Sequence, residues 1–315
     1  MEMEMPALPL ARYRLQFTAL TPVSLPPFAG STWRGAFGSA LKRLVCVTRA
    51  PACPPCPLWR GCAYPYLFDT PPLAGDSLLA KTGHAPLPLV LGVPLHAEPV
   101  QLEPGATTSL EVTLFGHGNR YLGYLVHALA QAGVRGIGKG HGALQLDAVL
   151  QHDGEDWRPI RAPDGTLSPL PPVVPTVPAC PVQVRMTLAT PLRLRLADTY
   201  VSPERFRADA LLLNLLRRLS QLIAHHTDAP LALDFRAMKV AAQTVEPLSA
   251  TLRWHEMARW SNRQQSLLQN GGLLGELLFD GAAIEAFWPL LWLGQWTHAG
   301  KNAGMGQGRY ALASA

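Results

Sequence analysis

The chain has 315 residues, of which 48% are hydrophobic and only 16% are charged. This composition excludes an intrinsically disordered protein, and the length is sufficient for two domains with separate cores. The net charge of +5, with five Lys against twenty-two Arg, favours a partner rich in phosphate, although a GC-rich genome would favour the same residues.

The first half of the chain predicts a strand, a helix, two strands, a helix and a strand. Tyr13, Leu15 and Phe17 alternate with polar residues, as in a strand with one buried face. A helix is predicted after Ser31, which is a favourable N-cap. The later elements are strands at 87–93 and 109–115, a helix from residue 119 and a strand at 143–150.

The second half predicts the same order of elements. A strand at 182–194 precedes a helix that opens at Ser202-Pro203-Glu204 and extends to Ile223. Further elements are strands at 248–257 and 273–279, a helix at 284–296 that is kinked near Pro289, and a strand at 310–312.

Both halves therefore have the βαββαβ order of a ferredoxin-like domain. The sequence predicts an α+β protein with tandem ferredoxin-like (RRM-like) domains at residues 1–160 and 182–315. A proline-rich segment at 161–181 is predicted to be the extended linker between them, because proline at that density excludes a helix.

Two glycine-rich loops lie at corresponding places in the two halves, at residues 136–142 and 304–309. Each follows a helix and precedes a strand, whereas a dinucleotide-binding glycine motif follows a strand and opens a helix. Each loop can present backbone N–H groups to an anion. A tight helix-to-strand connection without a ligand is the alternative.

Acidic residues are absent around both loops. There is no Asp or Glu at 5–68, at 112–146 or after residue 285, although each of these stretches carries Lys or Arg. Several separate acid-free regions favour a polyanion, because each neutralised phosphate adds affinity by releasing counterions.

Four cysteines lie within an insert at residues 46–64, namely Cys46, Cys53, Cys56 and Cys62. In a reducing compartment this spacing favours a tetrahedral Zn²⁺ site over disulfides. The predicted role is structural, because all four ligand positions would be filled. An iron–sulfur cluster is less favoured, and four unligated thiols remain the alternative.

No secretory signal or membrane span is predicted. The first five residues are acidic and lack a basic start, and the most apolar stretch, 273–296, is interrupted by three acidic residues and a proline. We expect a cytoplasmic protein with no membrane partner.

Several segments resemble one known family. They are residues 25–46 with the cysteines that follow, 64–69, 259–264, 271–276 and 298–310. The chain is similar, over nearly its whole length, to CRISPR-associated endoribonucleases of the RAMP superfamily, which process precursor CRISPR RNA. The resemblance implies cleavage within the repeat, a product retained through its 3′ stem-loop, and partner subunits of a CRISPR effector complex.

The resemblance also implies a metal-independent reaction. The ribose 2′-OH attacks the adjacent phosphate and leaves a 2′,3′-cyclic phosphate and a 5′-OH, which requires a base, an acid and cations around the phosphorane. No cofactor is expected for catalysis. Many members carry a catalytic His in the first domain, but this chain has no His before His84. An arginine-dependent site is therefore expected, and it would suit divergent branches such as type IV systems.

Because the first domain lacks the usual histidine, catalysis is assigned mainly to arginines. The predicted catalytic residues are Arg34, Arg43, Arg259 and His298. The predicted RNA-binding residues are Arg120, Lys139, His141, Arg263, Lys301, Gly304, Gly306, Gly308 and Arg309. Because surface arginines contact phosphate more often than they catalyse, each catalytic assignment has a plain binding role as its alternative.

Two other functions fit the same residues. A non-catalytic RNA-binding RAMP subunit would share the fold and explain the missing histidine. A zinc-stabilised protein-interaction module would use the cysteine insert and would need no RNA.

Overall fold

The structure is a computed structural model, and it describes residues 7–72, 85–196, 199–229, 233–261 and 266–315. The chain divides into two compact units, which are described separately. The N-terminal unit comprises Leu8–Val174 and His225–Asp228, and the C-terminal unit comprises Pro175–Ala224 and Ala229–Ala315.

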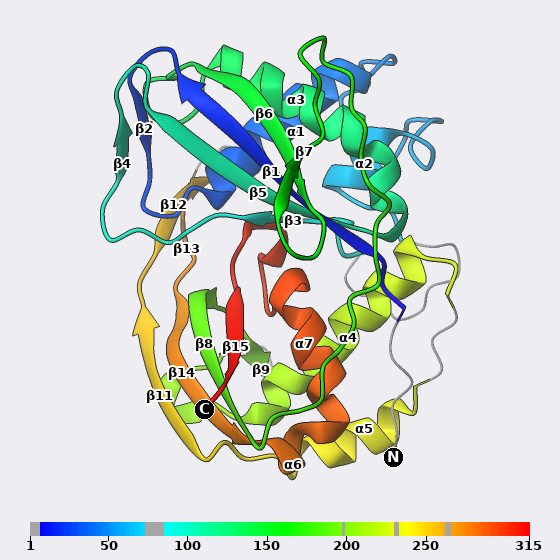
Figure 1. The fold of residues 1–315 in the computed structure, drawn as a ribbon, viewed down its shortest axis with the longest axis vertical. Helices are drawn as coiled ribbons and strands as arrows, with labels where there is room; N and C mark the ends of the chain where they lie inside the picture. Colours follow the sequence, from blue (N-terminus) through cyan, green and yellow to red (C-terminus); the bar gives the residue numbers. More distant parts are fainter. Residues whose placement is uncertain (1–6, 73–84, 197–198, 230–232, 262–265) are drawn as a thin grey trace. The chain divides into compact units, whose positions relative to one another are not determined.

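The N-terminal unit is built on a five-stranded antiparallel sheet with the order β3-β5-β1-β6-β7 (Figure 1). Its strands are β1 (Leu10–Ala19), β3 (Leu89–Gly92), β5 (Thr107–Phe115), β6 (Leu144–His152) and β7 (Trp157–Pro159). Alternation in β1 buries Tyr13, Leu15 and Phe17 on one face of the sheet.

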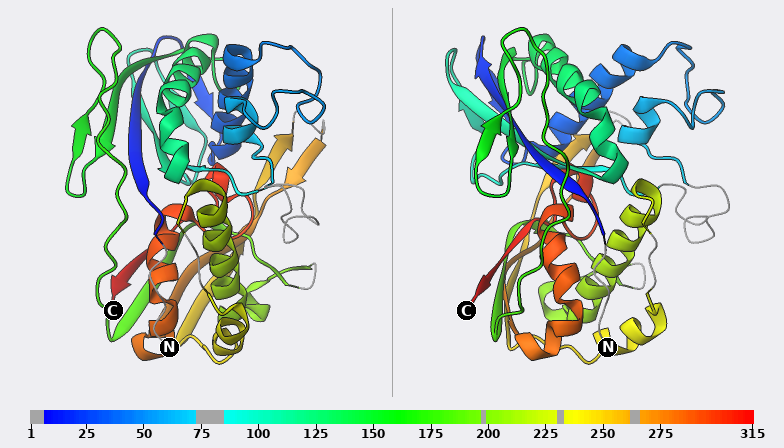
Figure 2. Two further views of the ribbon diagram at one scale, coloured as in Figure 1. Left: turned by 90° about the vertical axis from the view of Figure 1, so that its right-hand side faces the viewer. Right: turned by 45° about the vertical axis from the view of Figure 1, so that its right-hand side comes forward.

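Two helices, α1 (Gly30–Val45) and α3 (Leu122–Arg135), pack against each other in this unit (Figure 2). Trp33 of α1 lies over Phe17 of β1, with ring centroids 5.2 Å apart, so the apolar stripe of the helix covers the sheet. The smaller elements are β2 (Val23–Leu25), α2 (Ala63–Phe68), β4 (Val100–Leu102) and the 3₁₀ helix η1 (Gly116–Tyr121).

The C-terminal unit has a four-stranded antiparallel sheet with the order β11-β14-β8-β15. The strands are β8 (Gln183–Leu192), β11 (Ser249–His255), β14 (Gly272–Asp280) and β15 (Tyr310–Ser314). Helices α4 (Ala208–His226) and α7 (Trp288–Thr297) lie side by side on one face of the sheet (Figure 2). Leu211, Leu215 and Leu219 of α4 are fully or almost fully buried there.

Shorter elements connect these strands and helices. They are the hairpins β9 (Arg195–Leu196) with β10 (Thr199–Tyr200) and β12 (Ala258–Ser261) with β13 (Ser266–Gln269), the helices α5 (Phe235–Ala242) and α6 (Gly281–Ile284), and the 3₁₀ turns η2 (Pro203–Arg205), η3 (Glu285–Phe287) and η4 (Ala303–Met305).

Both sheets have the ferredoxin-like arrangement, in which the first and third strands of the βαββαβ unit lie at the centre. The predicted fold class is therefore confirmed. Two helix boundaries differ from the prediction: α4 begins at Ala208, after the turn at Pro203–Arg205, and the stretch from 284 breaks into η3 and α7, with Pro289 in the first turn of α7.

The proline-rich segment is partly ordered against the N-terminal unit. The N–H of Ser168 donates to the carbonyl of Ile160 at 2.8 Å, and Val173 forms an antiparallel bridge with Leu10. The division between units falls after Val174, inside the segment predicted as the linker. Among the helices of the described residues, none combines the length and the apolar character needed to cross a membrane.

We expect Gly294→Ala to lower the free energy of unfolding by about 1–3 kcal/mol, because a methyl group on this face of α7 overlaps the Tyr310 hydroxyl. That hydroxyl donates to the carbonyl of Leu291 at 2.7 Å, so Tyr310→Phe alone costs about 1 kcal/mol. The double variant should lose less than the sum in a double-mutant cycle measured by chemical unfolding. The control is Gly35→Ala, because Gly35 is exposed on α1 and a methyl group there meets no other atom. If the effects of Gly294→Ala and Tyr310→Phe simply added, the overlap between the new methyl group and the Tyr310 hydroxyl would be contradicted.

Candidate functional site

The glycine loop between α7 and β15, residues 298–309, is fastened to the end of β8. The Lys301 N–H donates to the carbonyl of Arg193 at 2.9 Å, and the Gly308 N–H donates to the carbonyl of Pro191 at 3.1 Å. The loop also closes on itself, because the Ala299 N–H donates to the carbonyl of Gly308 at 3.0 Å. Its ends are therefore fixed by backbone hydrogen bonds, together with bonds from the Gly300 and Arg309 N–H groups to the side chains of Asn214 and Thr190.

Two glycines of this loop are required by the close backbone approach. Gly308 has φ +68°, and a Cβ atom there would overlap the carbonyl of Ala299. Gly300 has φ +76°, and a Cβ atom would lie 2.5 Å from the carbonyl oxygen of Arg193. A larger residue at Gly300 would push the loop away from Arg193, and one at Gly308 would disrupt the closure of the loop on Ala299.

Buried polar side chains hold the middle of the loop. The Asn302 amide donates to Gln307 at 2.7 Å, and Gln307 donates to the carbonyl of Asn270 at 2.8 Å. Thr190 of β8 donates to the carbonyl of Gly306 at 2.7 Å. Because Gln307 and Thr190 are each only 1% exposed, these bonds form away from water and fix the loop.

The fixed loop presents part of the predicted RNA-binding set at its surface. Lys301 is exposed, while Gly304 and Arg309 are half-buried. Gly306 and Gly308 are buried, so their role in the loop is conformational. An exposed cation on a rigid, acid-free loop can attract an anion without first having to be ordered.

His298 lies beneath this loop and is only 4% exposed. Burial, with the charges of Arg309 and Arg218, lowers its pKa to about 3, so the imidazole is neutral at neutral pH. Its backbone has φ 58° and ψ 166°, a conformation that residues other than glycine rarely adopt. The surroundings are those of a core residue, and the predicted catalytic role of His298 stays a prediction that its position does not favour.

Arg218 of α4 is half-buried in the C-terminal unit. Its Nε–H donates to the carbonyl of Thr297 at 2.8 Å, next to His298. Burial lowers its pKa to about 10, which leaves the guanidinium charged at neutral pH. Within the described residues, the Nη2 atom of Arg218 and the Nδ1 atom of His298 are buried without a hydrogen-bond partner. The charge of Arg218 therefore lies close to the residue that opens the loop.

The glycine loop of the N-terminal unit, residues 136–142, has a different setting. Lys139 forms a bridge with Ser24, and a Cβ atom on Gly138 would overlap the carbonyl of Ser24. The glycines thus allow the loop to pack on β2. Lys139 and His141 are exposed, as is Arg120 on η1, so all three predicted contacts remain accessible to a ligand.

The two arginines predicted on α1 do not come together. Arg34 is half-buried, donates to the carbonyl of Phe68 at 2.9 Å and has its Cζ atom 4.1 Å from the centroid of the Phe68 ring. Arg43 is exposed and donates to Ser39 at 2.8 Å. Nine helical residues separate them by about two and a half turns, so they point to opposite sides of α1.

The side chains of the other two predicted arginines lie outside the part of the chain that the structure describes. Arg259 belongs to strand β12, but its side chain lies outside the described part of the structure, and Arg263 lies outside the described residues altogether. Within the N-terminal unit, the described residues do not bring Arg34 and Arg43 together.

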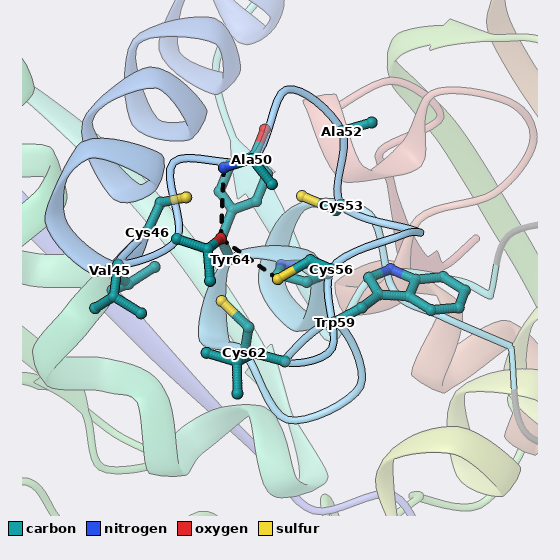
Figure 3. A pocket seen from close by; sticks show the side chains of 13 residues that line it. Val45, Cys46, Ala50, Ala52, Cys53, Cys56, Trp59, Cys62 and Tyr64 are labelled. Atoms are coloured by element: carbon teal, nitrogen blue, oxygen red, sulfur yellow. Dashed lines mark hydrogen bonds between the residues drawn. The ribbon is translucent and has the colours of Figure 1, made fainter.

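The four cysteines of the insert line one small cavity of about 30 Å³, and Figure 3 shows their sulfur atoms turned toward it. All four are half-buried free thiols. Burial raises the pKa of Cys53, and a hydrogen bond from Thr48 lowers the pKa of Cys56. Among the described residues, no three potential ligands are close enough together to hold a metal ion as they stand.

One cluster was not foreseen from the sequence. Tyr200 of β10 lies beside Arg193, Arg195 and Lys301 in the C-terminal unit. The alternation of arginine with leucine at 193–196, just before a tyrosine, is the signal that could have identified it.

Comparison with known proteins gives two family matches along the chain. Residues 8–171 match a family model described as an N-terminal domain. Residues 186–310 match the model of the CRISPR-associated endoribonuclease Cas6, and this region contains the loop at 298–309. No curated protein matches the chain.

Solved structures with a similar fold include two Cas6 product complexes. One is 15% identical with a TM-score of 0.55, covering 97% of this chain and 99% of its own. The other is 18% identical with a TM-score of 0.53, covering 98% of this chain and 100% of its own. A partial Cas6-RT-Cas1–Cas2 complex is 12% identical with a TM-score of 0.57, covering 99% of this chain and 47% of its own. At these identities the likeness concerns the fold.

We expect His298 to make the protein less stable in mild acid. The folded pKa of about 3 lies below the ordinary value of 6.5, so the unfolded chain takes up a proton that the folded chain does not. The stabilisation is complete above pH 6.5 and decreases as the pH falls toward 3, by about 2 kcal/mol between pH 7.5 and 5.0. Urea unfolding of the parent and of His298→Gln at both pH values measures the difference; an equal loss in the two proteins would contradict it.

Proposed function

Because the chain belongs to the CRISPR-associated RAMP-type endoribonuclease family, we propose that it cleaves precursor CRISPR RNA within the repeat and retains the product through its 3′ stem-loop. The observation that carries the proposal is the position of the loop at 298–309. It lies inside the family match, is fixed to β8, contains no acidic residue and displays Lys301.

The proposed reaction is transesterification without a metal ion. The 2′-oxygen loses its proton and attacks the adjacent phosphorus, the bond to the 5′-oxygen breaks, and that oxygen gains a proton. The products carry a 2′,3′-cyclic phosphate and a 5′-OH, and cations stabilise the charge of the phosphorane. Arginine serves the last role well, because it stays protonated, and for the same reason it is a poor base.

The catalytic candidates remain Arg34, Arg43, Arg259 and His298. Arg43 is the one whose described side chain is already exposed, whereas Arg34 would have to leave Phe68 and His298 would have to leave the core. Arg43 is therefore the first of these residues to test.

RNA binding is proposed for both units. In the C-terminal unit, phosphate groups would contact Lys301, Arg309 and the half-buried Gly304, while the buried Gly306 and Gly308 would hold the loop in shape. In the N-terminal unit the contacts would be Arg120, Lys139 and His141, and Arg263 completes the set. Such contacts give affinity that falls as salt is added.

Protein partners are proposed among CRISPR proteins. The structural neighbour described as a Cas6-RT-Cas1–Cas2 complex is a Cas6 joined to other CRISPR proteins, and this supports a protein partner for the present chain. We place that partner in an effector complex in the cytoplasm.

A structural zinc ion is proposed for the cysteine insert. The donor set fits Zn²⁺, since four thiols surround one cavity of about 30 Å³, although the sulfur atoms would have to move closer to bind together. When bound, the ion would cross-link Cys46, Cys53, Cys56 and Cys62, and it would take no part in the cleavage reaction.

A second function keeps the same fold without cleavage. A subunit that only binds CRISPR RNA would need neither a histidine near the N-terminus nor a free Arg34. The hydrogen bond from Arg34 to Phe68 is the observation that favours this alternative.

The test of cleavage uses the purified chain and 5′-labelled repeat RNA in EDTA. We expect one cut that leaves a 2′,3′-cyclic phosphate, and no cut when a 2′-deoxynucleotide precedes the scissile phosphate. Arg43→Ala should slow single-turnover cleavage by roughly 100-fold or more with binding retained, whereas exposed Arg185→Ala serves as the control. Tight binding of RNA that stays intact would select the non-catalytic subunit.

The test of zinc uses protein purified under reducing conditions. We expect about one zinc per chain by elemental analysis, loss of the metal with a strong chelator, and a lower unfolding temperature after its removal. Cys56→Ser should reproduce the loss, while Cys180→Ser, which lies outside the insert, should keep the metal. The zinc site would be refuted if the purified protein contained no metal and its unfolding temperature did not change when chelator was added.

A further inference from the structure

We propose that Tyr200 and the three cations around it form a stacking platform for one nucleotide of a single-stranded RNA segment, adjoining the loop at 298–309. This inference rests on the proposed function, since it assigns part of the RNA to a particular surface of the C-terminal unit.

The platform is defined by three measured contacts. The Cζ atom of Arg193 lies 4.1 Å from the centroid of the Tyr200 ring, and that of Arg195 lies 5.7 Å away. The Nζ atom of Lys301 lies 6.0 Å from the same centroid. Tyr200 and Arg195 are paired across the hairpin of β9 and β10, which fixes their separation.

Arg193 holds the platform in place from inside the unit. Its side chain comes from a residue only 7% exposed, and its Nη1–H donates to the Asn270 side chain at 2.9 Å. Its backbone carbonyl accepts the hydrogen bond from Lys301 that fastens the glycine loop. Its Nε atom is buried and has no hydrogen-bond partner among the described residues. One residue therefore supports both the tyrosine ring and the loop.

Tyr200 nevertheless remains accessible, with 39% of its surface exposed. A tyrosine backed by a buried guanidinium loses little conformational freedom when a base stacks on it. Arg195 and Lys301 are exposed at the rim, where the phosphate of the stacked nucleotide would lie.

This combination fits single-stranded RNA better than an acidic peptide. Single-strand binding uses an aromatic surface for the base together with cations for the backbone, and the platform supplies both. An acidic peptide would use the cations and leave the tyrosine without a role. Double-stranded RNA offers no splayed base to stack.

A similar-looking cluster in the N-terminal unit supplies a matched control. The Cζ atoms of Arg14 and Arg12 lie 4.1 and 5.3 Å from the Trp157 ring. There, Arg14 is paired with Glu111 at 2.6 Å, so the charge beside the ring is compensated. We expect Trp157→Leu to leave RNA binding unchanged.

Affinity for repeat RNA with single-stranded flanks tests the platform. Tyr200→Leu should weaken binding roughly 5- to 100-fold, whereas Tyr200→Phe, which keeps the ring, should stay within about twofold of the parent. Lys301→Gln should reduce the slope of log affinity against log salt by about 0.7, the value for one phosphate on a single strand. Tyr200→Leu should leave that slope unchanged.

Cross-linking identifies the contact independently of stability. RNA carrying 4-thiouridine in the flanks should cross-link to the peptide that contains Tyr200, and the cross-link should be lost in Tyr200→Leu. The melting temperature of each variant shows whether it is folded.

The outcomes separate this proposal from the proposed function. RNA that is cleaved normally and bound equally by Tyr200→Leu overturns the platform and leaves the nuclease. RNA that is bound through Tyr200 but not cut overturns the nuclease and supports the platform. Absence of any RNA binding overturns both, and equal Tyr200-dependent binding of poly-glutamate overturns the choice of RNA.

Discussion

The C-terminal unit depends on one close approach, between the end of β8 and the loop that joins α7 to β15. Backbone groups of Pro191 and Arg193 bond directly to Gly308 and Lys301, and a Cβ atom on the neighbouring Gly300 would lie 2.5 Å from the Arg193 carbonyl oxygen. Lys301 takes its position from that contact, and Tyr200 of the hairpin β9–β10 lies beside Arg193 at the same place. The arrangement has a local cost: a strained backbone at His298 and, within the part of the chain that the structure describes, buried nitrogen atoms of Arg218 and His298 that make no hydrogen bond.

The same glycine spacing serves a different purpose in each unit. In the N-terminal unit the loop pairs with Ser24 and lies on the short strand β2. In the C-terminal unit it lies on the end of a central strand and carries a network of buried side chains. Repetition of a pattern in the sequence therefore marks corresponding places in the fold, while the neighbours of each place determine what it can bind.

The fold was predictable because it follows from local patterns: alternation in β1, four-residue spacing in α1 and α4, and glycine after each last helix. The site was less predictable because it follows from distant neighbours. Arg34 donates to the carbonyl of Phe68, thirty-four residues later, and His298 lies close to Arg218 of α4, far earlier in the chain. Tyr200 lies beside Arg195 because β9 pairs with β10, and beside Lys301 because the glycine loop bonds to Arg193. Of these contacts, only those of Tyr200 with Arg193 and Arg195 lie within a short stretch of sequence; the others join residues that are far apart in the chain.

The half-buried guanidinium of Arg218 affects how anion binding at the loop responds to added salt. Dissolved ions gather around exposed charges such as Lys301 and screen them, but they screen a partly buried charge much less. With its pKa still at about 10, Arg218 keeps its charge at neutral pH. Because the Nη2 atom of Arg218 is buried, added salt weakens its attraction for an anion at this loop less than it weakens that of the exposed Lys301.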